Sequence, residues 1–219
     1  MSPKTQELKG QVTPDVHAGK KAVHEVTAKA QSQIDVATAE INKLSAELKV
    51  QTAEAKAKTM ARIDELTKDL DAIRKEQQAK IEARLKELDK KMESINADVK
   101  HASAKEKVAL EAKAKAARED YDSARKALTA SLDAEIAEWK TRISTAQEAA
   151  AEKKTAAKAD LQAKIADLHA KQEAAQKKLH AMKQANAAAF DELHSGVRTA
   201  INDLKTAMQH ARADISAAS

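Results

Sequence analysis

The feature that most constrains this chain is the near absence of residues that turn a backbone. From Lys20 to the C-terminus there is no proline, and Gly196 is the sole glycine. Ala, Glu, Lys, Gln and Leu dominate, and these residues are the strongest helix formers. Three aromatic residues among 219 are too few to fill a thick globular core. The sequence therefore predicts an all-α protein made of a few very long helices.

Large apolar residues recur in steps of three and four along these helices. The mean step is close to the natural helical period of about 3.6 residues, which predicts one apolar stripe per helix and nearly straight helices with little supercoil. This regularity argues against disorder. The expected fold is an elongated antiparallel coiled-coil hairpin or bundle, with a self-association seam built from twelve stripe residues. These seam residues are Ile63, Leu66, Leu70, Ile73, Leu128, Leu132, Ile136, Trp139, Ile143, Leu161, Ile165 and Leu168.

Helix start and stop signals divide the chain into two arms. Thr13 and Pro14 suit a helix start, so residues 1–13 are expected to form a flexible tail and 14–99 the first long arm. Weak helix formers before Ser103-x-x-Glu106, a capping-box match, favour a turn at 100–104. Residues 105–219 would then form the second arm. A helix that runs straight through remains the alternative.

The stretch "TAQEAAAEKKTAAKAD", residues 145–160, contains no apolar side chain larger than alanine. Its alanines predict a continuous helix whose small residues let a partner helix approach closely. The competing interpretation is a joint between two helices, because Thr145-x-x-Glu148 also matches a capping box.

Two halves of the chain show internal similarity. A shift of 95 residues places Ile41 on Ile136 and Leu66 on Leu161, with a thin Ala/Lys stretch between the matched clusters in each copy. This pattern indicates a tandem duplication, although low-complexity sequence also produces such matches by chance.

The sequence offers no constellation for catalysis. His169, His180 and His194 share roughly one helix face, but they stand too far apart along the axis to bind one metal ion. No phosphate-binding loop, nucleophile elbow or Glu-x-x-His pair occurs. We therefore expect no catalytic residue, no metal site, no cofactor and no small-molecule substrate. Trp139 is expected to pack in the core instead of anchoring the chain to a membrane.

Charge bears on the partners of the protein. The net charge is +5, but Lys/Arg and Asp/Glu are mixed in both halves, so nucleic acid is not an expected partner. Asp or Glu repeatedly precedes Lys or Arg by four positions, as at Glu138–Arg142, and this recurrence suggests a solvated outer face. No membrane-spanning run or signal-peptide core is present, which favours a cytoplasmic location.

The second half carries recognisable motifs. They are an "E-I-x-x-W" opening, a Lys/Ala-rich middle and an ending of the form "A-x-x-F-x-x-L-x-x-G-V-x-x-A-x-x-x-L". In this respect the chain resembles small, uncharacterised bacterial Ala/Lys/Glu-rich coiled-coil proteins, some of them stress-related. It is more loosely similar to apolipoprotein-like amphipathic helices, although it lacks their punctuating prolines. The resemblance implies neither a catalytic residue nor a cofactor. The residues that match the ending are Ala187, Phe190, Leu193, Gly196, Val197, Ala200 and Leu204.

Together these features predict a non-enzymatic structural or interaction protein. The expected role is a homo-oligomeric helical scaffold or spacer, because one narrow stripe buries little surface in a thin hairpin. The alternative is an amphipathic coat on a lipid or polymer-granule surface, similar to a phasin or an apolipoprotein, which the continuous stripe favours. Contact with a membrane or lipid surface would be weak.

Overall fold

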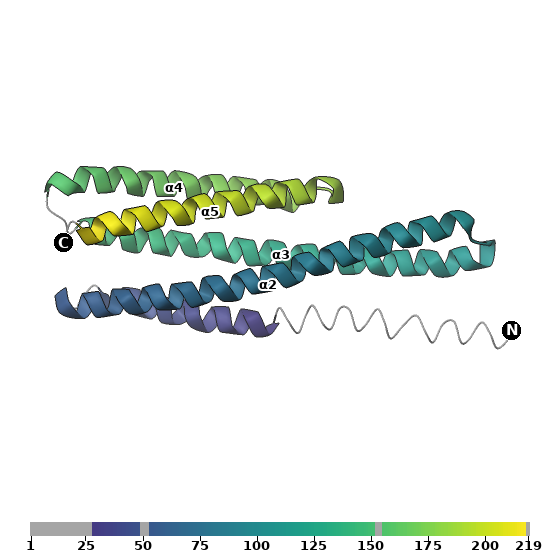
Figure 1. The fold of residues 1–219 in the computed structure, drawn as a ribbon, viewed down its shortest axis with the longest axis horizontal. Helices are drawn as coiled ribbons and strands as arrows, with labels where there is room; N and C mark the ends of the chain where they lie inside the picture. Colours follow the sequence, from purple (N-terminus) through teal and green to yellow (C-terminus); the bar gives the residue numbers. More distant parts are fainter. Residues whose placement is uncertain (1–27, 49–52, 152–154, 218–219) are drawn as a thin grey trace. The chain divides into compact units, whose positions relative to one another are not determined.

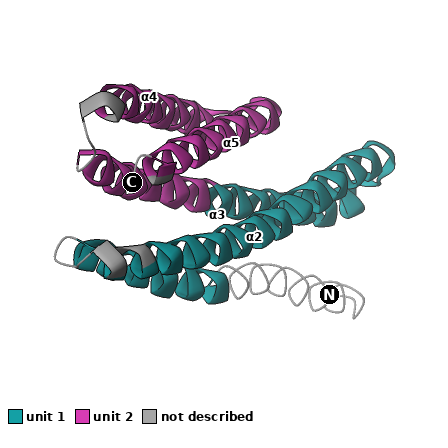
Figure 2. Ribbon diagram, turned by 60° about the vertical axis from the view of Figure 1, so that its left-hand side comes forward, with its two compact units in different colours: residues 1–128 teal, residues 129–219 magenta. Residues whose placement is uncertain are grey.

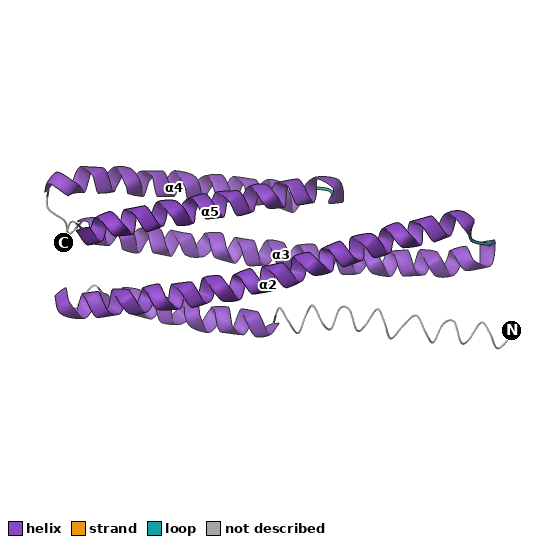
Figure 3. Ribbon diagram, viewed as in Figure 1, coloured by secondary structure: helices purple, strands orange, loops and turns teal. Residues whose placement is uncertain are grey.

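The structure, a computed structural model, describes residues 28–48, 53–151 and 155–217, and nearly all of these residues lie in α-helices joined by short connections (Figures 1 and 3). A first helix covers residues 28–47. It is followed by α2 (Ala53–His101), α3 (Ala104–Ala151), α4 (Thr155–Gln184) and α5 (Ala187–Ala217). None of these described residues belongs to a β-strand, so the predicted all-α class is confirmed. The expected tail at 1–13 lies outside the described residues.

The chain forms two compact units, residues 1–128 and 129–219, and the division between them falls within α3 (Figure 2). The first unit contains the 28–47 helix, α2 and the first half of α3. The second contains the remaining part of α3, α4 and α5.

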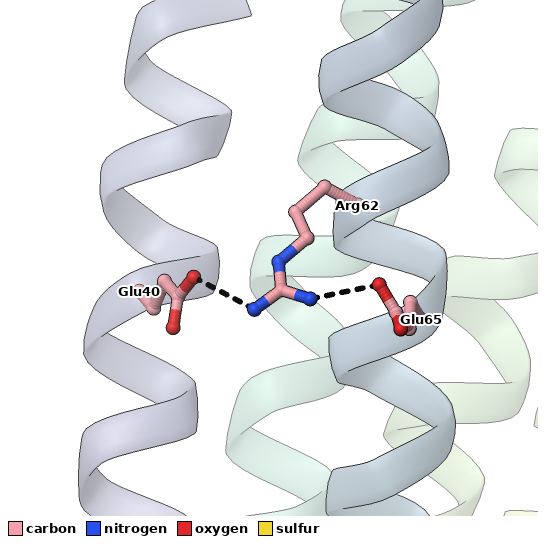
Figure 4. Close-up of polar contacts among 3 residues, drawn as sticks. All are labelled: Glu40, Arg62 and Glu65. Atoms are coloured by element: carbon pink, nitrogen blue, oxygen red, sulfur yellow. Dashed lines mark hydrogen bonds and ion pairs between the residues drawn. The ribbon is translucent and has the colours of Figure 1, made fainter.

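In the first unit the 28–47 helix runs antiparallel to the start of α2. The Arg62 guanidinium of α2 contacts both Glu40 across the helix pair, at 3.4 Å, and Glu65 one turn ahead, at 2.8 Å (Figure 4). In a continuous helix Glu40 and Arg62 would lie about 33 Å apart, so the chain reverses between them. The predicted single arm over 14–99 is therefore wrong for its described part. Beneath this ion pair, a core forms from Ile34, Ile41, Ile63, Leu66 and Leu70.

A second reversal joins α2 to α3 in the first unit. Only Ala102 and Ser103 separate the two helices, so the break lies within the expected 100–104 interval. Farther along the pair, Arg84 of α2 lies 3.8 Å from the carboxylate of Asp120 on α3. Helix α3 therefore runs back along α2.

Ser103 and Glu106 explain why α3 begins where it does. The backbone N–H and the hydroxyl of Ser103 both donate to Glu106 Oε2, at 2.9 and 2.6 Å. The N–H of Lys107 donates to the Ser103 carbonyl at 2.9 Å, which is the first bond of the new helix. The Glu106 carboxylate thereby satisfies the Ser103 N–H as in one half of a capping box, while the Ser103 hydroxyl bonds to the same carboxylate oxygen.

The second unit shows that the predicted continuous arm over 105–219 is wrong. Helix α3 ends at Ala151 and α4 begins at Thr155, with residues 152–154 outside the described part. Lys183 of α4 donates to Asp133 of α3 at 2.7 Å, which requires α4 to run back along α3. The predicted continuous helix over 145–160 is therefore wrong as well.

The competing interpretation of this stretch, a joint between two helices, is the one that the helix boundaries support, but the joint follows Ala151 and does not lie at Thr145. Thr145 lies inside α3, and its hydroxyl donates to the Thr141 carbonyl one turn earlier at 3.1 Å. The physical reason for the reversal is apolar burial. Folding back removes three α4 residues, Leu161, Ile165 and Leu168, from water, and burial of each such side chain is worth about 1.5–3 kcal/mol.

One more reversal, which was not predicted from the sequence, separates α4 from α5. Ala185 and Asn186 connect the two helices, and the Asn186 side-chain oxygen accepts the N–H of Ala189 at 3.0 Å. Lys164 of α4 forms an ion pair with Asp214 near the end of α5, so these helices are antiparallel too. Asparagine at a helix start and the eight-residue gap in the stripe before Phe190 were the available signals.

The 95-residue repeat does not carry over to the helix boundaries. Helix α4 begins 102 residues after α2. A shift of 102 residues places Ile41 on Ile143 and Ile63 on Ile165, and all four of these residues are buried. The predicted shift of 95 residues pairs buried residues as well, Ile41 with Ile136 and Leu66 with Leu161, so burial does not favour one register over the other.

Candidate functional site

The twelve predicted seam residues lie in the packing of the chain against itself. Eleven are buried and Ile73 is half-buried, packed against the core of the first unit. In the second unit Trp139, Ile143, Leu161, Ile165 and Leu168 belong to one core, which the α5 residues Leu204, Met208, Ala211 and Ile215 complete. These seam residues consequently present little apolar surface to a second copy.

Helix α3 carries a buried charge cluster where the sequence predicts solvated side chains. Glu138 and Arg142 were expected on a solvated face, yet each side chain is only 5% exposed. The Arg142 Nε and Nη2 both donate to Glu138 Oε1, at 2.8 and 2.5 Å. The guanidinium carbon of Arg142 also lies 4.5 Å from the centre of the Trp139 ring, a cation–π geometry.

Trp139 itself is 3% exposed and belongs to the core of the second unit, as expected. The pattern Glu-x-x-x-Arg recurs on solvated helix surfaces, so sequence spacing alone could not single out this pair. The signal that was available is its position directly beside the only tryptophan of the chain. The cluster can stabilise a conformation, but it brings together no nucleophile and no proton donor facing a cavity.

The outer faces carry exposed ion pairs that shift several pKa values. The Lys80 ammonium, 2.6 Å from Glu76, lowers the pKa of that carboxyl. Hydrogen bonds from the Ser103 hydroxyl and N–H lower the pKa of Glu106. Hydrogen bonds to Asp214 and then Asp160 raise the pKa of Lys164. Each shift has a structural partner on the same or the neighbouring helix, so none indicates a catalytic group.

The three histidines singled out by the sequence do not converge. His169 and His180 are exposed, and His180 contacts the Gln184 amide at 3.1 Å. His194 is half-buried and stacks on Phe190, with ring centres 6.3 Å apart. No group of three metal-ligating side chains occurs within 28–48, 53–151 and 155–217. Two further histidines near the start of the sequence, His17 and His24, lie outside the described residues.

The comparisons with known proteins add no assignment: the chain matches no protein-family profile, no curated protein and no solved structure. Within the described helices, none combines the length and the apolar character needed to cross a bilayer. The features left to interpret are therefore the internal seam, the buried charge cluster of α3 and the charged outer faces.

Proposed function

We propose that this protein is a non-enzymatic helical scaffold or spacer. The observation that carries the proposal is the use of the apolar stripe: eleven of the twelve seam residues are buried by the chain's own helices. The charged side chains mostly lie on the outer faces, where they keep long helices in solution. In this proposal the chain provides a stiff helical surface and has no catalytic role of its own.

The finer architecture belongs to the same proposal. We propose an antiparallel, coiled-coil-like bundle in which each helix is nearly straight, because the stripe follows the natural helical period. Each pair of consecutive helices carries an ion pair between them, and these pairs support the antiparallel order. The four ion pairs are Glu40–Arg62, Arg84–Asp120, Asp133–Lys183 and Lys164–Asp214.

Self-association through the seam, the expectation from sequence, would require these helices to exchange partners between copies. The proposed scaffold instead consists of one chain whose stripe is filled internally. Light scattering combined with circular dichroism at several protein concentrations tests this. The expected result is the mass of one chain with full helicity at every concentration. Helicity that develops only together with a dimeric or larger mass would contradict the single-chain scaffold.

A further inference from the structure

The charges of α4 and α5 are sorted by sign. Six of the nine Lys and Arg residues on these helices are half-buried beside the apolar stripe, whereas six of the seven Asp and Glu residues are exposed. In α2 the order is different: nine of eleven described Lys and Arg side chains are exposed. Sorting of this kind is therefore a property of the α4–α5 hairpin and does not follow from the overall composition.

The cations follow the stripe at regular spacing. Lys164 and Lys171 of α4 are separated by seven residues, and each side chain is 35% exposed. On α5, the half-buried Arg198, Lys205 and Arg212 repeat with the same spacing. Each of the α5 cations stands three positions before a buried stripe residue: Ile201, Met208 and Ile215.

The stem of a further cation lies along the contact between the two helices. A Cβ placed on Gly196 of α5 would lie 3.9 Å from the Lys178 side-chain Cδ of α4. The Lys178 residue as a whole is nevertheless exposed, so its ammonium group reaches water. This is the arrangement in which a long cationic side chain covers apolar surface and keeps its charge at the boundary.

From this arrangement we infer that the α4–α5 hairpin binds an anionic phospholipid surface. When α4 and α5 part, their apolar stripes face the acyl region, the flanking cations lie at the level of the lipid phosphates, and the carboxylates point to water. The apolar residues of α4 and α5 are out of water in both states, so their own contribution nearly cancels, whereas α3 residues of the same core, such as Trp139 and Ile143, lose the cover of the hairpin. Attraction of the cations to anionic headgroups then decides the balance.

Flotation of the full chain with vesicles tests the inference directly. Vesicles of phosphatidylglycerol and phosphatidylcholine should carry the protein upward at low salt, and vesicles of phosphatidylcholine alone should not. The emission of Trp139, the single tryptophan, should change on binding because its core is opened. Absence of binding to the anionic vesicles, or equal binding to both kinds, overturns the inference.

Two variants with the same change in net charge distinguish binding through the cations beside the α5 stripe from general attraction by the net charge of the protein. Replacement of Arg198, Lys205 and Arg212 by Gln should weaken binding to the anionic vesicles at least about tenfold. Each Lys or Arg near an anionic surface contributes about 1 kcal/mol to the free energy of binding. The control replaces three exposed α2 residues, Lys75, Lys86 and Lys90, by Gln and should change affinity by about twofold or less. Equal losses in the two variants would show attraction by net charge alone and contradict the inference. Arg198→Lys with Arg212→Lys should retain binding and keeps the test independent of any loss of folding.

A covalent bridge between α4 and α5 tests whether the two helices must separate before the protein binds vesicles. The chain has no cysteine, so K164C/D214C can be bridged selectively with a short bis-maleimide across the α4–α5 contact. The unbridged double variant lacks the stripe cation Lys164 and serves as the reference, and the bridged form of the same variant should bind the vesicles far more weakly than this reference. Full binding of the bridged protein would overturn the opening step. The single-chain mass without lipid is a separate measurement, so this inference and the scaffold proposal can fail independently.

Discussion

At the scale of single residues, Gly196 occupies a helical position where neither the backbone conformation nor a close contact requires glycine. It lies inside α5, and none of the glycines within the described ranges has a positive φ. An added Cβ would meet Lys178 at 3.9 Å, an ordinary van der Waals distance. Gly196→Ala should therefore stabilise the protein by about 0.5–1 kcal/mol, because alanine loses less backbone entropy in a helix. A lower melting temperature by circular dichroism would show that the Lys178 stem cannot adjust.

The Ser103–Glu106 cap makes the start of α3 sensitive to pH. Folding lowers the pKa of Glu106, so this contribution is fully present above the carboxyl's unfolded pKa and is lost as pH falls through its folded pKa. Wild type should lose more stability between neutral and acidic pH than Glu106→Gln, which cannot ionise. Urea unfolding at a series of pH values measures the difference. Parallel pH profiles for the two proteins would contradict the role of the carboxylate.

The buried pair on α3 predicts a difference between single and double substitutions. Arg142→Met leaves the Glu138 carboxylate buried without this partner and should cost about 3–5 kcal/mol. The double variant Glu138→Met/Arg142→Met should recover much of that loss, since two apolar side chains of similar length can fill the site. Urea unfolding of both variants gives the comparison. A double variant as unstable as the single one would show that the pair itself stabilises the core.

At the scale of helices, the beginning of α4 predicts opposite effects of proline at two alanines. Ala156 lies in the first turn of α4, where a missing N–H removes no helical bond, so Ala156→Pro should cost about 1 kcal/mol or less. Exposed Ala170 lies in the middle of the same helix, and Ala170→Pro should cost about 3 kcal/mol or more. Thermal melts of the two variants check the boundary. A large loss in Ala156→Pro would place residue 156 inside a continuous helix.

The helices also show what sequence could and could not predict. The all-α class and the apolar stripe follow from the spacing of apolar residues along the sequence. The break near Ser103 follows from the capping residues Ser103 and Glu106. Both kinds of signal are local and can be read in the sequence. The breaks after Ala151 and at Asn186 depend on which helices pack their apolar stripes against each other. An alanine-rich stripe can pack against several other helices almost equally well. The burial of Glu138 and Arg142 depends on neighbouring helices in the same way. Local patterns therefore predicted the elements, and tertiary packing decided how many times the chain turns.

At the scale of the whole molecule, the order of helices in the second unit can be tested by crosslinking. Asp133 and Lys183 lie in contact across α3 and α4. Cysteines at these two positions should join within one chain through a short bis-maleimide. Cysteines at exposed Asp133 and exposed Ala170 provide the control, because Ala170 lies about 20 Å farther along α4. Products of twice the chain mass as the main outcome would mean that α4 pairs with another copy.

The four interhelix ion pairs have a consequence for how the chain reaches this structure. Each pair joins helices that follow one another in sequence, and the partners are separated by 22 to 50 residues. Proteins dominated by contacts at short sequence separation fold fastest, because little loop entropy is lost before contacts form. Each hairpin can close as soon as its second helix leaves the ribosome. Assembly during synthesis then leaves an uncovered stripe exposed only for the time needed to add one more helix.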